Sequence, residues 1–240
     1  MISGRYLRPC GQETSPLPRN LERLRIGVGD ESVSALLIRP ANSKALYLFA
    51  HGAGARMTHK SMESNAEGLA ARAIATLRYQ FPYMEKGSKR PDPPRIAHAA
   101  VRAAAAEAAK LAPDLPLFAG GRSFGGRMTS QAQAVEALPG VRGLAFLGFP
   151  LHPAGKPGIE RAEHLKRVQI PMLFVSGDRD ALAEPNLLKP MIAELGDRAT
   201  LRLVAHADHS LKVPVKSGRT GADAEAEALD AMAEWMFGQG

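Results

Sequence analysis

A serine between glycines is the first candidate for chemistry in this sequence. Residues 121–125 read Gly-Arg-Ser-Phe-Gly, and another glycine follows at position 126. An apolar run precedes the motif, and apolar residues at helical spacing follow it to about Leu138. The pattern predicts a strand, a very tight turn with Ser123 at its apex, and a helix, an arrangement that exposes a nucleophilic hydroxyl. Gly121 and Gly125, two positions before and after Ser123, lack the side chains that would collide in such a turn.

A serine hydroxyl is a weak nucleophile, so it needs a base, usually a histidine that a carboxylate orients. Downstream of Ser123, residues 176–180 (Ser-Gly-Asp-Arg-Asp) follow one predicted strand. Residues 205–210 (Ala-His-Ala-Asp-His-Ser) follow the next one. Because the carboxyl ends of parallel strands meet at one edge of a sheet, we expect these groups to converge with the serine. The chain order is nucleophile, acid, histidine.

The residues alone leave two choices within this predicted triad. The acid is Asp180 or Asp178, and the base is His209 or His206. An aspartate directly after a strand is often a turn former, which is the other interpretation of Asp178. His206 is nearer the strand, and we expect it to pack or to form a hydrogen bond nearby.

A second glycine-rich segment, residues 51–55 (His-Gly-Ala-Gly-Ala), follows the apolar run 45–50. Small residues let the backbone approach a substrate closely. Acyl transfer builds negative charge on a carbonyl oxygen, and backbone N–H donors stabilise that charge. The segment is therefore a candidate oxyanion loop. It is no phosphate-binding loop, because neither G-x-x-x-x-G-K-[ST] nor G-x-G-x-x-G stands at a strand–helix turn.

Short apolar runs alternate with helical spacing along the chain, which predicts an α/β fold with a mostly parallel central sheet flanked by helices. Predicted strands cover residues 21–29, 33–39, 45–50, 75–79, 116–119, 143–149, 171–176 and 200–205. Predicted helices cover residues 61–73, 93–112, 124–138, 160–167, 184–195 and 221–237. The polar, proline-rich segment 81–94 and segment 150–158 are expected to be surface loops that line or partly cover a site. We expect no sizeable cap domain.

Taken together, these motifs resemble the α/β-hydrolase superfamily, most closely its small dienelactone-hydrolase-like members. The resemblance extends from about residue 45 to residue 240. It rests on residues 51–54, 121–126, 177–180 and 208–210. It implies the α/β-hydrolase fold, in a single domain over residues 21–240 after a loose leader of residues 1–20.

The resemblance also implies roles for single residues. It favours Asp180 as the acid and His209 as the base, and it points to the backbone amides of Phe124 and Ala53 as the oxyanion hole. His51 then braces its own loop. No cofactor is implied. Dienelactone hydrolases themselves use a cysteine nucleophile where this chain has serine, which argues against dienelactone as the substrate.

The expected function is that of a serine hydrolase that cleaves a carboxylic ester or a related small acyl compound through an acyl-enzyme. Thioester or peptide hydrolysis would use the same machinery. The alternative from another class is a non-catalytic interaction protein on the same fold, because fold does not fix function.

The composition excludes several other classes. The 31 basic and 24 acidic residues give a net charge of +7, but the charges are scattered without aromatic interleaving, so we expect no nucleic-acid partner. No apolar stretch reaches the length of a membrane span, and we expect no membrane partner. The only cysteine, Cys10, favours a reducing cytoplasm. No metal-binding spacing accompanies the histidines, so no metal is expected.

Five basic residues raise the question of a cationic rim around the site. They are Arg122 and Arg127, which flank the serine, and Lys86, Lys89 and Arg90 in the predicted loop. Solvated surface charge is the preferred interpretation, and a rim that attracts a carboxylate-bearing substrate is the other.

Overall fold

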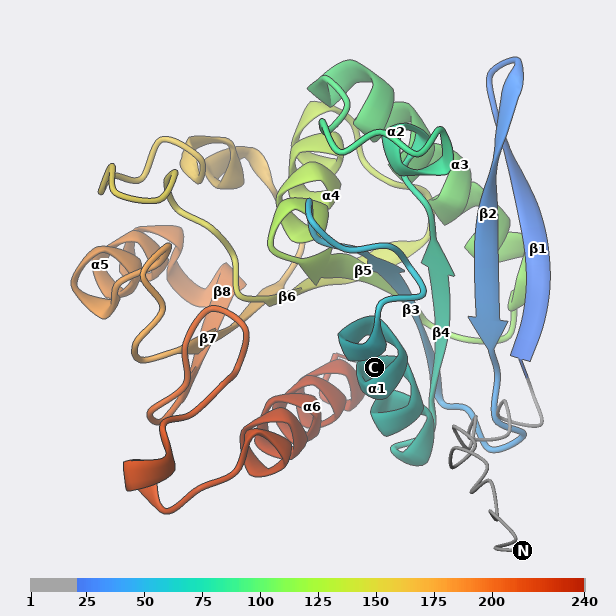
Figure 1. Cartoon of the computed structure of the whole chain (residues 1–240). Coiled ribbons are helices and arrows are strands. Elements are labelled where there is room, and N and C mark those ends of the chain that lie inside the picture. The colour runs from blue at the N-terminus through green and yellow to red at the C-terminus, as the bar shows by residue number, and fades with distance from the viewer. Residues whose placement is uncertain (1–20, 240) are drawn as a thin grey trace, which may run out of the picture.

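One eight-stranded sheet organises the part of the chain that the structure, a computed structural model, describes, namely residues 21–239. Its strand order is β1-β2-β4-β3-β5-β6-β7-β8 (Figure 1). The predicted leader and Cys10 lie outside the described residues.

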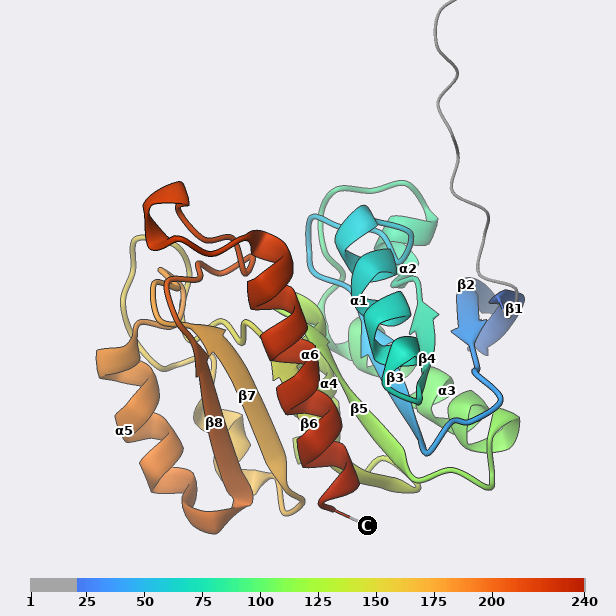
Figure 2. The same ribbon diagram turned by 90° about the horizontal axis from the view of Figure 1, so that it is seen from below.

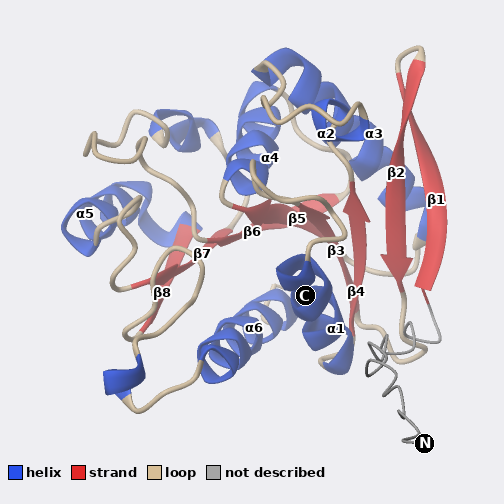
Figure 3. Cartoon of the chain, in the orientation of Figure 1, coloured by secondary structure: helices blue, strands red, loops and turns tan. Residues whose placement is uncertain are grey.

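Strands and helices alternate as the sequence predicts (Figure 3). The strands are β1 (Leu21–Val28), β2 (Glu31–Ile38), β3 (Ala45–Ala50), β4 (Ile74–Tyr79), β5 (Leu117–Arg122), β6 (Val141–Leu147), β7 (Met172–Gly177) and β8 (Ala199–Val204). The α-helices are α1 (Lys60–Ala71), α2 (Pro82–Glu85), α3 (Pro94–Leu111), α4 (Phe124–Val135), α5 (Pro185–Leu195) and α6 (Gly221–Phe237). Three 3₁₀ turns are η1 (Glu163–Arg167), η2 (Gly196–Arg198) and η3 (Val215–Ser217).

Strands β3 to β8 run parallel, whereas β1 and β2 form an antiparallel hairpin that joins the sheet through β4. Every residue of β3, β4 and β7 is buried. Such continuous apolar runs are expected where helices cover both faces of a parallel sheet. The carboxyl ends of β3, β5, β7 and β8 therefore share one edge, where the candidate site residues follow.

Helices cover both faces of the sheet (Figure 2). Residues of α3, α4 and α5 pack in one hydrophobic cluster, and residues of α1 and α6 pack in another. Strand β3 contributes alternate residues to the two clusters: Leu46, Leu48 and Ala50 to the first, and Ala45, Tyr47 and Phe49 to the second. This period of two places the sheet as the middle layer of a three-layer sandwich.

Segment 81–94 departs from the predicted surface loop in its first residues, whereas none of residues 84–94 is buried. It begins with the buried residues Phe81 and Tyr83, and it contains the short helix α2. Proline at the first position of α2 favours that turn, because its missing N–H would be unpaired there anyway. The aromatic side chains pack into the core instead of facing solvent.

Two predicted helices are shorter than expected. The helix after Ser123 ends at Val135, not at about Leu138, because Pro139 disfavours helical geometry in the residue before it. The predicted helix 160–167 is only the 3₁₀ turn η1. Pro157 and Gly158, shortly before the predicted helix 160–167, are poor helix formers. Neither difference moves a candidate site residue.

The short connections leave no room for a sizeable cap domain, as expected. Within residues 21–239, no helix has the length and apolar character that would let it cross a membrane.

Candidate active site

Ser123 occupies a strained turn between β5 and α4. Its φ of 48° and ψ of −115° lie in a region that side-chain-bearing residues rarely adopt. A Cβ added to Gly125 would lie 2.5 Å from the carbonyl oxygen of Ala50, and one added to Gly121 would lie 2.3 Å from the same oxygen. The end of β3 therefore packs directly against the turn, and only glycine fits at these two positions.

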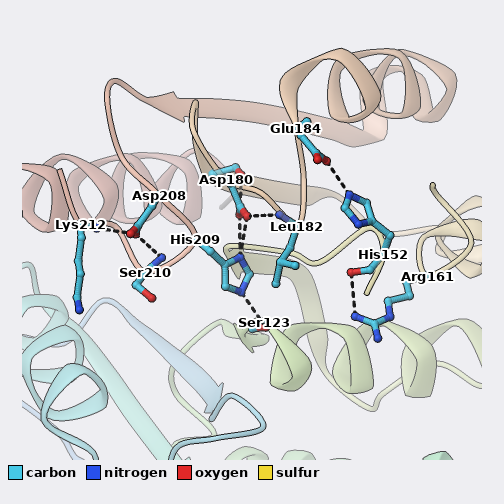
Figure 4. Close-up of polar contacts among 11 residues, drawn as sticks. Ser123, His152, Arg161, Asp180, Leu182, Glu184, Asp208, His209, Ser210 and Lys212 are labelled. Atoms are coloured by element: carbon cyan, nitrogen blue, oxygen red, sulfur yellow. Dashed lines mark hydrogen bonds and ion pairs between the residues drawn. The ribbon is translucent and has the colours of Figure 1, made fainter. Parts of the chain in front are cut away.

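Three side chains that are far apart in the sequence meet at this turn (Figure 4). The Oγ atom of Ser123 lies 3.0 Å from Nε2 of His209. The Nδ1 atom of His209 lies 2.8 Å from Oδ2 and 3.0 Å from Oδ1 of Asp180. Because a carboxylate only accepts, Nδ1–H is the donor, and Nε2 is left to accept the serine proton.

Asp180 is held from several sides at the end of β7. It is 1% exposed, and its Oδ1 accepts a hydrogen bond of 2.8 Å from the backbone N–H of Leu182. The hydroxyl of Ser176 lies 3.4 Å from Oδ2. These contacts orient the carboxylate toward His209, as the acid of such a triad requires.

The two alternatives from the sequence lie elsewhere. Asp178 does not reach His209: its backbone N–H bonds to Val204, and its Oδ1 is buried without a partner among the described residues. The expectation that His206 packs or forms a hydrogen bond is wrong. Its side chain is exposed, and its backbone is left-handed with a φ of 65°.

The candidate oxyanion loop lies beside the serine. A Cβ added to Gly52 would be 3.7 Å from the carbonyl oxygen of Arg122 and 3.9 Å from Cβ of Ser123. Within residues 21–239, neither the N–H of Ala53 nor that of Phe124 has a hydrogen-bond acceptor. Phe124 begins α4, so its N–H is one of the free donors at a helix N-terminus. Both amides are thus available for an anionic oxygen.

His51 and Tyr83 hold this loop from behind. His51 is fully buried; its Nε2 accepts from the N–H of Phe81 at 3.0 Å, and its Nδ1 lies 2.8 Å from the carbonyl of Gly52. Burial lowers the pKa of His51 to about 4, so the ring is neutral. The hydroxyl of Tyr83 donates to the carbonyl of Ala53 at 2.8 Å. The sequence analysis missed Tyr83, although the apolar start of segment 81–94 was a signal that this part is buried.

Gly148 is a second position that the sequence analysis missed. It follows β6 with a φ of 65°, and a Cβ there would lie 3.0 Å from the carbonyl of His209 and 3.3 Å from its ring. Gly148 therefore makes room for the histidine loop. A glycine directly after an apolar strand was the only signal in the sequence.

A cavity of about 320 Å³ opens in front of Ser123. Its lining consists mostly of small residues: Gly52, Ala53, Gly54, Ala55, His59, Ser61, Arg122, Ser123, Leu182, His209 and Ser210. Arg122 is the one lining residue with a permanent charge. Burial lowers the pKa of Arg122, and its Nη1 donates to Asn65 at 3.1 Å. The other four basic residues of the predicted rim do not line this cavity, so Arg122 is the only one of the five that borders it.

The described part of the chain holds no cluster of side chains typical of a metal site. No group of three or more histidine, cysteine, aspartate or glutamate side chains lies close enough together there to hold a metal ion.

A family model described as an alpha/beta hydrolase domain matches residues 43–237, most of the chain. The chain belongs to the alpha/beta hydrolase family. In this alpha/beta hydrolase the match begins just before β3 and ends with α6, so it spans the serine turn and all three residues of the triad-like arrangement.

Solved structures share this alpha/beta hydrolase fold at low sequence identity. An alpha-beta serine hydrolase homologue from Coxiella burnetii superposes with a TM-score of 0.71 at 18% identity, over 90% of this chain and 99% of that one. A dienelactone hydrolase from Anabaena variabilis gives a TM-score of 0.69 at 19% identity, over 91% and 98%. The esterase domain of a Rhodothermus marinus protein gives 0.67 at 16%, over 90% and 97%.

Proposed function

We propose that this alpha/beta hydrolase is a serine hydrolase that cleaves a small carboxylic ester through an acyl-enzyme. The observation that carries the proposal is the unbroken chain of hydrogen bonds from Ser123 through His209 to Asp180. A strained serine at a helix N-terminus, with a base and a buried acid in line, has little purpose in a protein that only binds.

In the first step, Oγ of Ser123 attacks the ester carbonyl while Nε2 of His209 takes the hydroxyl proton. The carbon–oxygen π electrons move to the carbonyl oxygen and make it an oxyanion. Asp180 keeps His209 in the tautomer that can accept the proton, and then stabilises the imidazolium that forms. Its burial and its second contact with Leu182 support this role.

The amides of Ala53 and Phe124 are the proposed donors to that oxyanion. In other enzymes the loss of one such donor costs about 3 to 4 kcal/mol of transition-state stabilisation. When the tetrahedral intermediate collapses, His209 returns its proton to the departing alcohol. Water then attacks the acyl-enzyme by the same route, and the acid leaves. Apart from this water, the steps use only side chains and backbone amides of the chain.

The cavity favours a small substrate. Its volume of about 320 Å³ and its lining of small residues offer little surface to a long acyl chain. Hydrolysis of esters, rather than of thioesters or peptides, agrees with the esterase domain among the proteins of similar fold. Arg122 would favour an ester that carries negative charge.

Covalent labelling with a fluorophosphonate probe tests the proposal directly, because the probe reacts only with an activated serine. We expect the wild type to be labelled and Ser123→Ala to remain unlabelled. Ser210→Ala is the matched control: it removes another hydroxyl from the same cavity and should be labelled like the wild type. Folded wild-type protein that takes up no label contradicts the proposal and favours an interaction protein. A screen of p-nitrophenyl esters of graded length then defines the acyl group.

A further inference from the structure

Two buried histidines, His51 and His152, make the same local contact but differ in their second partner. In each, Nδ1 faces the backbone carbonyl of the next residue, at 2.8 Å for His51 and 2.9 Å for His152. Nε2 of His51 then accepts from a backbone N–H. Nε2 of His152 instead lies 2.6 Å from Oε2 of Glu184, which is an acceptor when ionised.

This difference fixes the charge of His152. A neutral imidazole has one N–H, so it can donate to only one of two acceptors. Both ring nitrogens of His152 face acceptors, and the side chain is 1% exposed, so no water molecule can replace the hydrogen bond that a neutral ring would lack. Glu184 is partly exposed, which favours its ionised form. The contacts are satisfied together only when His152 is an imidazolium.

The electrostatic surroundings agree with a charged ring. Burial alone would lower the pKa of His152, but its contacts with the Pro153 carbonyl and the Glu184 carboxylate outweigh burial, and the pKa is raised above 6.5. The guanidinium of Arg161, whose Nη1 donates to the His152 carbonyl, acts in the opposite direction. Glu184 and Arg161 are the charged groups that act on the ring.

The ion pair joins the loop after β6 to the loop that carries the candidate acid (Figure 4). Next to it, the N–H of Leu151 donates to the carbonyl of Leu182 at 2.8 Å. Leu182 lines the cavity, and its own N–H holds Oδ1 of Asp180 at 2.8 Å. Between Asp180 and Glu184 the chain is thus held at both ends.

We propose that His152 is a positioning residue: as a buried imidazolium paired with Glu184, it fixes the loop that presents Leu182 to the substrate cavity and Asp180 to His209. The part of this proposal that concerns turnover rests on the proposed hydrolase function. The protonation state and its effect on the Asp180–His209 contact do not.

The geometry determines whether low or high pH favours the contact between His152 and Glu184. Below the pKa of His152 in the folded protein both contacts are made and the loop is held. As the pH rises through that value the ring loses one proton and one contact, and the loop is released. The proposal therefore predicts an alkaline limb in kcat that follows the titration of His152.

Nitrogen NMR of protein with ¹⁵N-labelled histidine tests the charge, with the His152→Gln spectrum giving the assignment. We expect both ring nitrogens of His152 to be protonated at low pH, and one proton to be lost only at a higher pH than in a free histidine. We also expect the Nδ1–H signal of His209 to shift or broaden in Glu184→Gln. A His152 ring that loses its second proton at a lower pH than a free histidine, or an unchanged His209 signal in folded Glu184→Gln, overturns the proposal even if the protein hydrolyses no ester.

Steady-state kinetics on a p-nitrophenyl ester tests the positioning role. We expect Glu184→Gln and His152→Gln to lower kcat about tenfold with little change in KM, because small misplacement of a catalytic group slows chemistry strongly. Both should lack the alkaline limb, and Glu184→Asp should retain it. Glu194→Gln, which removes an exposed carboxylate paired with Lys166, is the matched control and should behave as wild type. Full kcat with an unchanged pH profile in Glu184→Gln contradicts the proposal.

Discussion

Two aspartates stand two positions apart after β7, and their contacts give them different tasks. Asp180 is buried against His209, whereas Asp178 has no contact with that ring. The backbone of Asp178 bonds to the end of β8, so this residue shapes the turn. A sequence pattern cannot separate the two, because either spacing from the strand can bring a carboxylate near a histidine.

Exchange of each aspartate for asparagine separates their roles. We expect Asp180→Asn to lower kcat on a p-nitrophenyl ester by about 10³- to 10⁴-fold, since the amide no longer holds His209 in the productive tautomer. We expect Asp178→Asn to change kcat less than about threefold, because at this position no charge faces the base. Steady-state kinetics of the two variants, with circular dichroism to check folding, makes the comparison. Equal losses in both variants would mean that the acid is shared or misassigned.

At the scale of elements, the end of β3 and the start of α4 pack so closely that only glycine fits between them. A Cβ on Gly125 would lie 2.5 Å from the Ala50 carbonyl and 2.6 Å from that of His51, and both are backbone atoms that cannot rotate away. The same contact brings the candidate oxyanion loop beside Ser123. Close packing and the geometry of the candidate site therefore both depend on Gly125.

We expect Gly125→Ala to lower the free energy of unfolding by about 2 to 3 kcal/mol or more, as overpacking against backbone does. Gly27→Ala is the matched control, because a Cβ there meets nothing within 4 Å. Urea denaturation followed by circular dichroism measures both variants. A Gly125→Ala protein as stable as Gly27→Ala would show that β3 and α4 can separate at little cost.

The elements themselves were largely predictable from the sequence, and the contacts between them were not. Continuous apolar runs indicated the buried strands, and the glycines around Ser123 indicated the turn. The role of Tyr83 was hidden, because segment 81–94 is polar and proline-rich on average while its first residues are buried. The partner of His152, Glu184, is 32 residues away in sequence, and spacing carries no information about such a pair.

Neither segment 81–94 nor segment 150–158 contributes a side chain to the cavity lining. Each instead supports a loop that does: Tyr83 holds Ala53, and Leu151 holds Leu182. We expected both segments to line or partly cover the site, and this is corrected: they lie behind the loops that line it. A loop can tune a site from there without covering it.

At the scale of the whole molecule, β1 and β2 precede the part that the family model matches, yet they extend the same sheet through β4. Val33, Ala35 and Leu37 of β2 share a hydrophobic cluster with α3 and α4. We infer that residues 21–239 fold as one domain, with the hairpin as an integral part of it.

The buried histidines make the stability of this domain depend on pH. Burial is the largest cause that lowers the pKa of His51 and of His164, each to about 4. A fall from 6.5 to about 4 corresponds to about 3 kcal/mol for one group. Because the unfolded chain binds more protons than the folded one between these values, stability is complete above pH 6.5 and declines as the pH falls toward 4. His152 contributes in the opposite sense and loses its contribution as the pH rises.

We therefore expect the free energy of unfolding to fall by about 2 kcal/mol between pH 7 and pH 5 on account of His51 alone. His51→Gln should be less stable at pH 7, since its ring contacts are lost, but its decline toward pH 5 should be smaller by that amount. Urea denaturation at both pH values gives the difference, which does not depend on the absolute stability of the variant. The exposed His206 supplies the control, because His206→Asn should keep the wild-type pH dependence. If His51→Gln and the wild type decline equally, His51 is not the neutral, buried group that its contacts with Phe81 and Gly52 require.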